Sequence, residues 1–126
     1  GADQMLECDG TWFDKPVDRA AARAQLRALR GRTHRLIVCA VTVRDDTRLW
    51  HQTDTADLTM RPLSDAFIDA YLDAAGEAAL RSVGAYQLES LGAQLFSRVH
   101  GDYFTVLGLP LLPLLGFLRE HKVVPT

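Results

Sequence analysis

The longest run of apolar and β-branched residues is the feature of this sequence that most restricts its fold. Between residues 34 and 44 five side chains are Leu, Ile or Val, and they follow one another too closely for a half-exposed strand. Asp45 and Asp46 then form a turn pair, and Leu49 to Met60 alternates polar and apolar residues less cleanly. The sequence therefore predicts a hairpin of two long strands.

Two helices are predicted on either side of this hairpin. Asp18 caps a segment from about 17 to 30 whose apolar side chains follow helical spacing, and Gly31 ends it. After the hairpin, Ser64 caps a second helix from about 64 to 74. Each predicted helix thus has its own start signal.

The two ends of the chain add further elements. Residues 1 to 8 predict a strand that ends in the turn dipeptide Asp9-Gly10, and residues 94 to 99 predict another strand. A last helix is expected from about Pro110 to Glu120, because proline is tolerated at the first helical position. Interleaved strands and helices indicate an α/β fold with a mixed β-sheet and flanking helices.

Composition sets the limits on domain number and partners. With 126 residues, 48% hydrophobic, the chain is expected to form a single domain over residues 1–126. A net charge of −2 offers no global positive field, so no nucleic acid partner is expected. The longest apolar stretch, from 104 to 118, is broken by glycine and proline and is too short for a membrane span, so no membrane association is expected.

Several common site classes are excluded by their missing motifs. Cys8 and Cys39 are the only cysteines and form no CxxC pair, which predicts free thiols and a cytoplasmic protein. The four histidines have no metal-ligand spacing. Neither GxxxxGK[ST] nor GxGxxG occurs, which argues against a P-loop or dinucleotide-binding enzyme.

Six short segments, taken in order, resemble the Maf family of nucleoside triphosphate pyrophosphatases. They are Gly1-Ala2-Asp3-Gln4, Lys15-Pro16, Gly31-Arg32-Thr33-His34, Leu63-Ser64 with Ile68 and Tyr71, Gly84-Ala85-Tyr86, and Gly101-Asp102-Tyr103 with Gly108-Leu109-Pro110-Leu111. The resemblance implies a fold like that of inosine triphosphate pyrophosphatase, with a cleft between two lobes. It also implies hydrolysis between the α- and β-phosphates of a nucleoside triphosphate, with Mg²⁺ or another divalent cation as cofactor.

The family's opening segment has no match in this chain. Members of the family begin with a Ser-rich, Arg-Arg-containing loop and helix that bind the triphosphate, and the first residues here resemble the middle of a strand instead. We therefore expect the domain to lack its N-terminal phosphate-binding segment, and this piece alone to be inactive.

Asp3 matches the family's catalytic acidic residue. A carboxylate can accept the proton of the attacking water or hold Mg²⁺. The residues around Asp3 are mostly small or apolar, and an unpaired charge there would be costly, so we expect it to have a partner or a task. The alternative is a strand-edge aspartate that caps a turn.

Lys15 follows Asp3 across the Asp9-Gly10 turn, which allows the chain to double back toward the carboxylate. An ammonium group neutralises charge on transferred phosphoryl oxygens. Lys15 is therefore the predicted phosphate contact, and the alternative is a solvated lysine before a helix.

Gln4 and Glu89 depart together from the commonest pattern of the family, which has Thr or Ser and Gln at these positions. Both departures resemble the subgroup that acts on 7-methyl-GTP, whereas the subgroup acting on dTTP and UTP keeps Thr and Gln. A carboxylate suits a purine edge with adjacent N–H donors and a cationic methylated ring. We expect a 7-methyl-GTP preference; the alternatives are a dTTP/UTP-preferring enzyme, or an ordinary strand residue and a loop acid.

The remaining basic residues have plainer interpretations. Arg19, Arg23 and Arg27 recur every four residues, which is typical of a solvated helix face; steering of a triphosphate or a subunit contact is the alternative. His34 is expected to be a structural residue at a strand entrance.

The resemblance also bears on partners and cellular role. Homodimers are common in the family, and it has been linked to septum formation and cell-division arrest. A non-catalytic, division-associated interaction protein is therefore the competing hypothesis to an enzyme that clears modified or surplus nucleotides from the cytosol.

Overall fold

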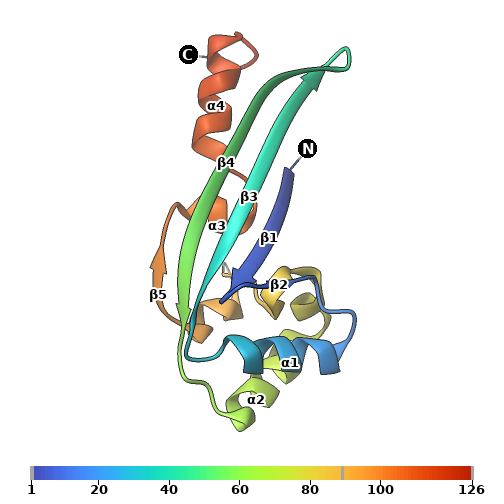
Figure 1. Cartoon of the computed structure of the whole chain (residues 1–126), viewed down its shortest axis with the longest axis vertical. Helices are drawn as coiled ribbons and strands as arrows, with labels where there is room; N and C mark the ends of the chain where they lie inside the picture. The colour runs from blue at the N-terminus through green and yellow to red at the C-terminus, as the bar shows by residue number, and fades with distance from the viewer. Residues whose placement is uncertain (1, 89, 126) are drawn as a thin grey trace.

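The computed structural model describes residues 2–88 and 90–125, and its centre is a long five-stranded sheet in the order β2-β1-β3-β4-β5 (Figure 1). The strands are β1 (Ala2–Cys8), β2 (Thr11–Phe13), β3 (Thr33–Arg44), β4 (Thr47–Met60) and β5 (Phe96–His100). The α-helices are α1 (Arg19–Leu29), α2 (Asp65–Ala75), α3 (Tyr103–Leu107) and α4 (Leu111–Glu120), and the 3-10 helices are η1 (Gly76–Arg81), η2 (Val83–Ala85) and η3 (Leu91–Leu95).

The β3–β4 hairpin is the predicted one, and it spans almost the full length of the molecule (Figure 1). Asp45 and Asp46 form its turn with φ of 51° and 61°, the left-handed conformation that tight hairpins require. Even-numbered side chains of both strands are the more buried ones, because successive residues point to opposite faces. One face of the sheet is therefore a core face and the other is open.

The α/β class with flanking helices is confirmed, and the pairing within the sheet is now defined. Every pairing among the described strands is antiparallel, so the parallel pair that a mixed sheet would contain is not found in this part of the chain. The β1–β2 and β3–β4 pairings follow from their connections, because short hairpin turns join the strands of each pair.

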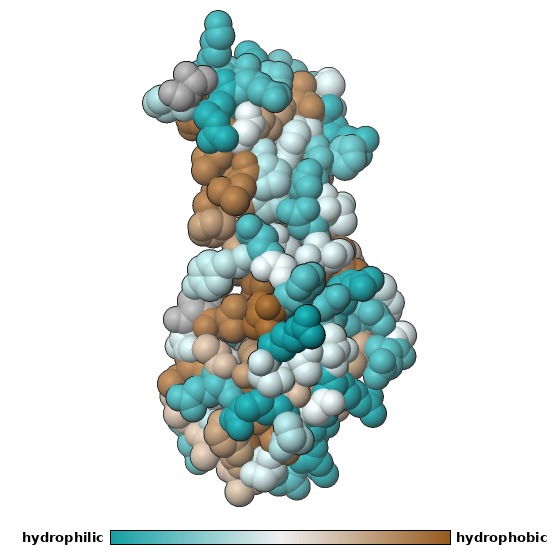
Figure 2. Space-filling model, turned by 90° about the vertical axis from the view of Figure 1, so that its left-hand side faces the viewer, coloured by the Kyte–Doolittle hydropathy of each residue, from teal (hydrophilic) through white to brown (hydrophobic). Residues whose placement is uncertain are grey.

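The core lies at the lower end of the sheet, where α1, α2 and the 3-10 helices cover its inner face (Figure 1). Leu6, Leu26, Leu36 and Leu58 are fully or almost fully buried there. Further up, α4 lies beside the hairpin, and Phe117 stacks on Trp50 with 5.6 Å between ring centroids. Apolar side chains gather on the flank that carries α3, β5 and α4 (Figure 2).

The predicted caps of the two long helices are present. The amide of Ala21 donates to the Asp18 carboxylate at 2.8 Å, and the amide of Phe67 donates to the Ser64 hydroxyl at 3.0 Å. Asp102 likewise caps α3, a five-residue helix that the sequence analysis did not predict. No helix in the described residues is both long and apolar enough to span a membrane.

The arginines of α1 face the aspartates of α2. Arg19 pairs with Asp73 at 2.6 Å, and Arg23 donates to Asp69 at 2.8 Å. Asp65 accepts from Arg30 at 2.6 Å. The arginine series is thus an inter-helix ion-pair ladder on the surface rather than a free basic patch, which explains its four-residue spacing.

Candidate active-site cleft

Asp3 and Lys15 line the same open cleft, which has a volume of about 460 Å³. The strand β2 pairs only with Leu6–Cys8 of β1, so the backbone edge of β1 before Leu6 is not covered by β2. The chain doubles back through the β1–β2 turn as predicted, and the register Leu6 opposite Phe13 carries the following residues toward Asp3. The predicted pair of functional groups therefore shares one cavity.

Asp3 is exposed, and this corrects the expected burial of its carboxylate. The alternation of β1 places it on the open face of the sheet, while Leu6 enters the core. Its Oδ1 accepts only the local amide of Gln4 at 3.0 Å among the described residues. The carboxylate is therefore hydrated and available to a ligand, and it needs no buried partner.

Lys15 is also exposed, and its ammonium lies more than 4.0 Å from every described carboxylate. A lysine without an internal ion pair is available to pair with an anion in the cleft. Phosphate oxygens are the anions that such a point charge suits.

Asp14 is a third charged group on the cleft, and sequence reasoning did not single it out. Its position immediately before Lys15 was the available signal. Mg²⁺ binds through one or two carboxylates together with substrate phosphates and water, so Asp3 and Asp14 fit that ion. Among the described residues no group of three or more His, Cys, Asp or Glu could hold a metal, so this part of the chain contains no complete protein cage.

Gln4 lies on the opposite side of β1 from Asp3 and connects the strand to α3. Its Nε2 donates to the carbonyl of Val106 at 2.9 Å. A carbonyl only accepts, so this bond fixes the orientation of the amide and leaves Oε1 as an acceptor. Gln4 also lines a small cavity of about 40 Å³, whose walls include Val83, Gln87 and Leu107.

Glu89 lies outside the described residues, so its predicted role in substrate selection is not tested. Among the described residues next to it, the amides of Ser90 and Gly92 both donate to the carbonyl of Gln87 at 3.1 Å. A Cβ at Gly92 would lie 2.4 Å from that same oxygen, so only glycine fits.

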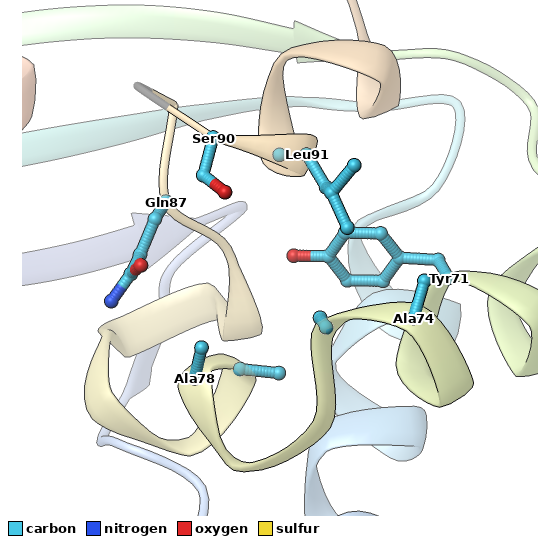
Figure 3. Close-up of a pocket in the computed structure, with 9 residues that line it drawn as sticks. Tyr71, Ala74, Ala78, Gln87, Ser90 and Leu91 are labelled. Atoms are coloured by element: carbon cyan, nitrogen blue, oxygen red, sulfur yellow. The ribbon is translucent and has the colours of Figure 1, made fainter.

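A further cavity of about 100 Å³ lies between the end of α2 and this loop (Figure 3). The Tyr71 ring forms one side with Leu91 next to it, and Gln87 lies on the opposite side. The Tyr71 hydroxyl donates to the carbonyl of Ala85 at 2.8 Å, and burial raises its pKa to about 12. Tyr71 is therefore a fixed wall and not an acid or base.

The three cavities are neighbours. Gln4 and Val83 line both the cleft and the small cavity, and Gln87 lines both the small cavity and the one beside Tyr71. Shared lining residues thus link the cleft of Asp3 and Lys15, through the small cavity beside Gln4, to the cavity beside Tyr71.

His34 is structural, as predicted. It is 1% exposed, and its Nε2 lies 2.8 Å from the Tyr86 hydroxyl. Burial lowers the pKa of His34 to about 4, so the ring is neutral at pH 7. Cys8 and Cys39 are free thiols, as expected.

Comparison with known proteins matches residues 1–121 to the family described as Maf-like protein. The chain is 64% identical over 126 residues to a nucleoside triphosphate pyrophosphatase of Paramagnetospirillum magneticum, covering 99% of this chain and 65% of the relative. It is 60% identical over 121 residues to a protein of the same name from Nitrobacter winogradskyi, covering 96% of this chain and 60% of the relative.

A third relative, from Granulibacter bethesdensis, carries the same name and is 52% identical over 124 residues, covering 98% of this chain and 63% of the relative. The chain thus spans 60 to 65% of the length of these three curated relatives. Because the family match extends over the strand of Asp3, the turn to Lys15 and the loop around position 89, the chain belongs to the Maf-like protein family.

Proposed function

We propose that this protein hydrolyses nucleoside triphosphates between the α- and β-phosphates, releasing a nucleoside monophosphate and pyrophosphate. The observation that carries the proposal is the single cleft of about 460 Å³ that Asp3, Asp14 and Lys15 share. The name of the relatives, nucleoside triphosphate pyrophosphatase, agrees with acidic and basic groups that line one cavity.

Asp3 and Lys15 act on different groups in this reaction. The hydrated carboxylate of Asp3 accepts the proton of the water that attacks a phosphorus atom. The ammonium of Lys15 binds the phosphate oxygens and neutralises the charge that develops on them. The bond that breaks is the phosphoanhydride, and pyrophosphate is the leaving group.

Mg²⁺ is part of the proposal, with Asp3 and Asp14 as its protein ligands. When bound, it would neutralise phosphate charge as a Lewis acid. Two carboxylates and a lysine give the cleft a mixed charge, so a triphosphate gains more from entering together with a divalent cation than alone.

We further propose 7-methyl-GTP as the preferred substrate. Gln4 offers a fixed acceptor, and Glu89, two residues after Gln87 in the sequence, would add a carboxylate. Such acceptors suit the N–H donors of guanine, and a negative charge suits a methylated, cationic ring.

Pyrophosphate release tests the proposal directly. The protein at its full native length is incubated with Mg²⁺ and 7-methyl-GTP, GTP, UTP or dTTP, with Asp3→Asn beside it. We expect release that is fastest with 7-methyl-GTP and falls roughly 10²- to 10⁴-fold in Asp3→Asn. Asp46→Asn, in the hairpin turn, is the matched control and retains full rate.

Two results would contradict the proposal in different ways. Equal turnover of UTP and 7-methyl-GTP would contradict the proposed substrate preference but not the proposed reaction. No release from any nucleotide by a folded protein would remove the reaction and favour a non-catalytic interaction protein.

A further inference from the structure

Gln87 is a polar side chain at the junction of two cavities, and neither the family resemblance nor the proposed reaction uses it. It lines both the 40 Å³ cavity that it shares with Gln4 and the 100 Å³ cavity beside Tyr71. The residue is partly buried, and its side-chain amide forms no hydrogen bond with any described residue. A partly buried amide without a partner is costly unless water or a ligand pairs with it.

The backbone of Gln87 is held firmly although its side chain is free. Its carbonyl accepts from Ser90 and Gly92, and the absence of a Cβ at Gly92 allows that close turn. The neighbouring Tyr86 is buried, and its hydroxyl is hydrogen-bonded to His34. Gln87 therefore projects from a rigid base, which reduces the entropy lost when its amide binds a ligand.

The small cavity admits one edge of a ring and not a whole nucleotide. Its volume of about 40 Å³ lies next to the cleft of about 460 Å³, and the two share Gln4 and Val83. A nucleotide with its phosphates beside Lys15 would leave its base as the part that reaches this cavity. The polar groups there are consequently placed to bind the edge of a base.

The geometry points to Gln87 as a residue that selects the base: its side-chain NH₂ donates to the O6 of a guanine whose N–H groups donate to Oε1 of Gln4. This inference rests on the proposed function and extends it. The chemistry is complementary, since the amide of Gln4 is fixed as an acceptor by Val106, whereas the free amide of Gln87 supplies the missing donor.

The pairing predicts a preference among bases. Guanine presents an O6 acceptor beside N–H donors, and adenine presents an amino group at the position of O6. Uracil has a similar acceptor and donor but is a smaller ring that reaches less far into the cavity. The ligand class is therefore a guanine nucleotide, methylated or not.

Two variants of Gln87 and a matched control test the inference at the level of turnover. Gln87→Leu removes both donor and acceptor, and Gln87→Glu removes the donor but keeps the size. We expect each to raise KM for GTP roughly three- to tenfold, the worth of one hydrogen bond, with kcat and the KM for UTP little changed. Gln94→Leu, an exposed glutamine that lines neither cavity, leaves all values unchanged.

Binding to the 126-residue chain gives a readout that does not depend on catalysis. The side-chain NH₂ signals of Gln87 are assigned from their loss in Gln87→Leu and followed in ¹H–¹⁵N spectra during titration with GMP, UMP and tripolyphosphate. We expect them to shift with GMP, less with UMP, and not with tripolyphosphate.

The two experiments separate the inference from the function on which it rests. If wild-type protein releases pyrophosphate but KM for GTP in Gln87→Leu and Gln87→Glu stays within twofold of wild type, the inference is wrong and the function stands. If no nucleotide is hydrolysed but GMP shifts the Gln87 signals, the reaction is wrong and the base-binding role stands. If GMP leaves the signals unmoved, Gln87 does not bind a base.

Discussion

The imidazole of His34 and the phenol of Tyr86 meet in the core, with 2.8 Å between Nε2 and the hydroxyl oxygen. The two residues are 52 positions apart, and the bond connects β3 to the segment just before position 89. The other ring nitrogen, Nδ1, is buried and has no hydrogen-bond partner among residues 2–88 and 90–125. A protonated His34 would therefore bury a charge with one unsatisfied donor.

This arrangement predicts how stability depends on pH. Burial lowers the pKa of His34 from 6.5 to about 4, so the unfolded chain takes up a proton below about pH 6.5 while the folded chain does not. The free energy of unfolding should fall by about 3 kcal/mol between pH 7 and pH 4 from this group alone. Urea unfolding at several pH values measures it.

The control for this prediction is the exposed His100. His34→Gln should remove most of the acid-dependent loss, whereas His100→Gln should leave it intact. An unchanged pH profile in His34→Gln would show that other groups cause the acid sensitivity.

Gly84 should tolerate no side chain. Its φ is +83°, and a Cβ would lie 2.7 Å from the Tyr86 ring and 2.8 Å from the Leu6 side chain. Gly10 has a similar φ of +86° but open space around it. We expect Gly10→Ala to cost about 1 kcal/mol from backbone strain and Gly84→Ala roughly 2–4 kcal/mol, because overpacking adds to it. Equal losses in thermal or urea unfolding would contradict this account of the packing.

Lys15 can be compared with the only other lysine of the chain, Lys122. If Lys15 binds the phosphates, Lys15→Gln should lower kcat/KM for every nucleotide by roughly 10²-fold, irrespective of the base. Lys122→Gln, near the end of the chain, should keep full activity. A loss confined to one nucleotide would argue for a role in base selection instead.

The ion pairs between α1 and α2 should differ in strength. Asp65 lies within 4.0 Å of Arg23, Arg27 and Arg30, whereas Asp73 pairs with Arg19 alone in the described part of the chain. The hydrogen bond from Arg30 lowers the pKa of Asp65, so its stabilisation is present above the usual carboxyl pKa and is lost as the pH falls below it. Asp65→Asn should lower Tm more than Asp73→Asn.

Salt distinguishes this explanation from a packing effect. Both side chains are about half exposed or more, so their attraction is screened by ions. The difference in Tm between the two variants should shrink in 1 M NaCl, where the Debye length is about 3 Å. A difference that persists would point to helix packing.

The elements with strong local signals were predictable from sequence. The β3–β4 hairpin has a β-branched strand and an Asp-Asp turn, and α1 and α2 have Asp18 and Ser64 as caps. The helix α3 was missed because five residues are too few to show a repeating helical pattern of apolar side chains. Asp102 was nevertheless a recognisable N-cap residue. The elements that were predicted correctly are those whose sequence pattern lies within a few neighbouring residues.

What depends on distant contacts could not be predicted in the same way. Asp65, Asp69 and Asp73 repeat at the spacing of the arginines in α1, yet only the packing of the two helices makes them partners. The exposure of Asp3 depends on which face of β1 meets the core. Asp14 and Gln87 become candidates only when the cavities that they line are known. The role of Glu89 stays a prediction.

The bond from Gln4 to Val106 also bears on the order in which the chain folds. It joins residues 102 positions apart, and closing a loop of that length costs about 4 kcal/mol in chain entropy. A single hydrogen bond returns only about 1 kcal/mol, so we expect the contact to form after β3 and β4 have brought both ends together. On this expectation the surface that would bind a base is completed late in folding, and a partly folded chain would have no place for a nucleotide.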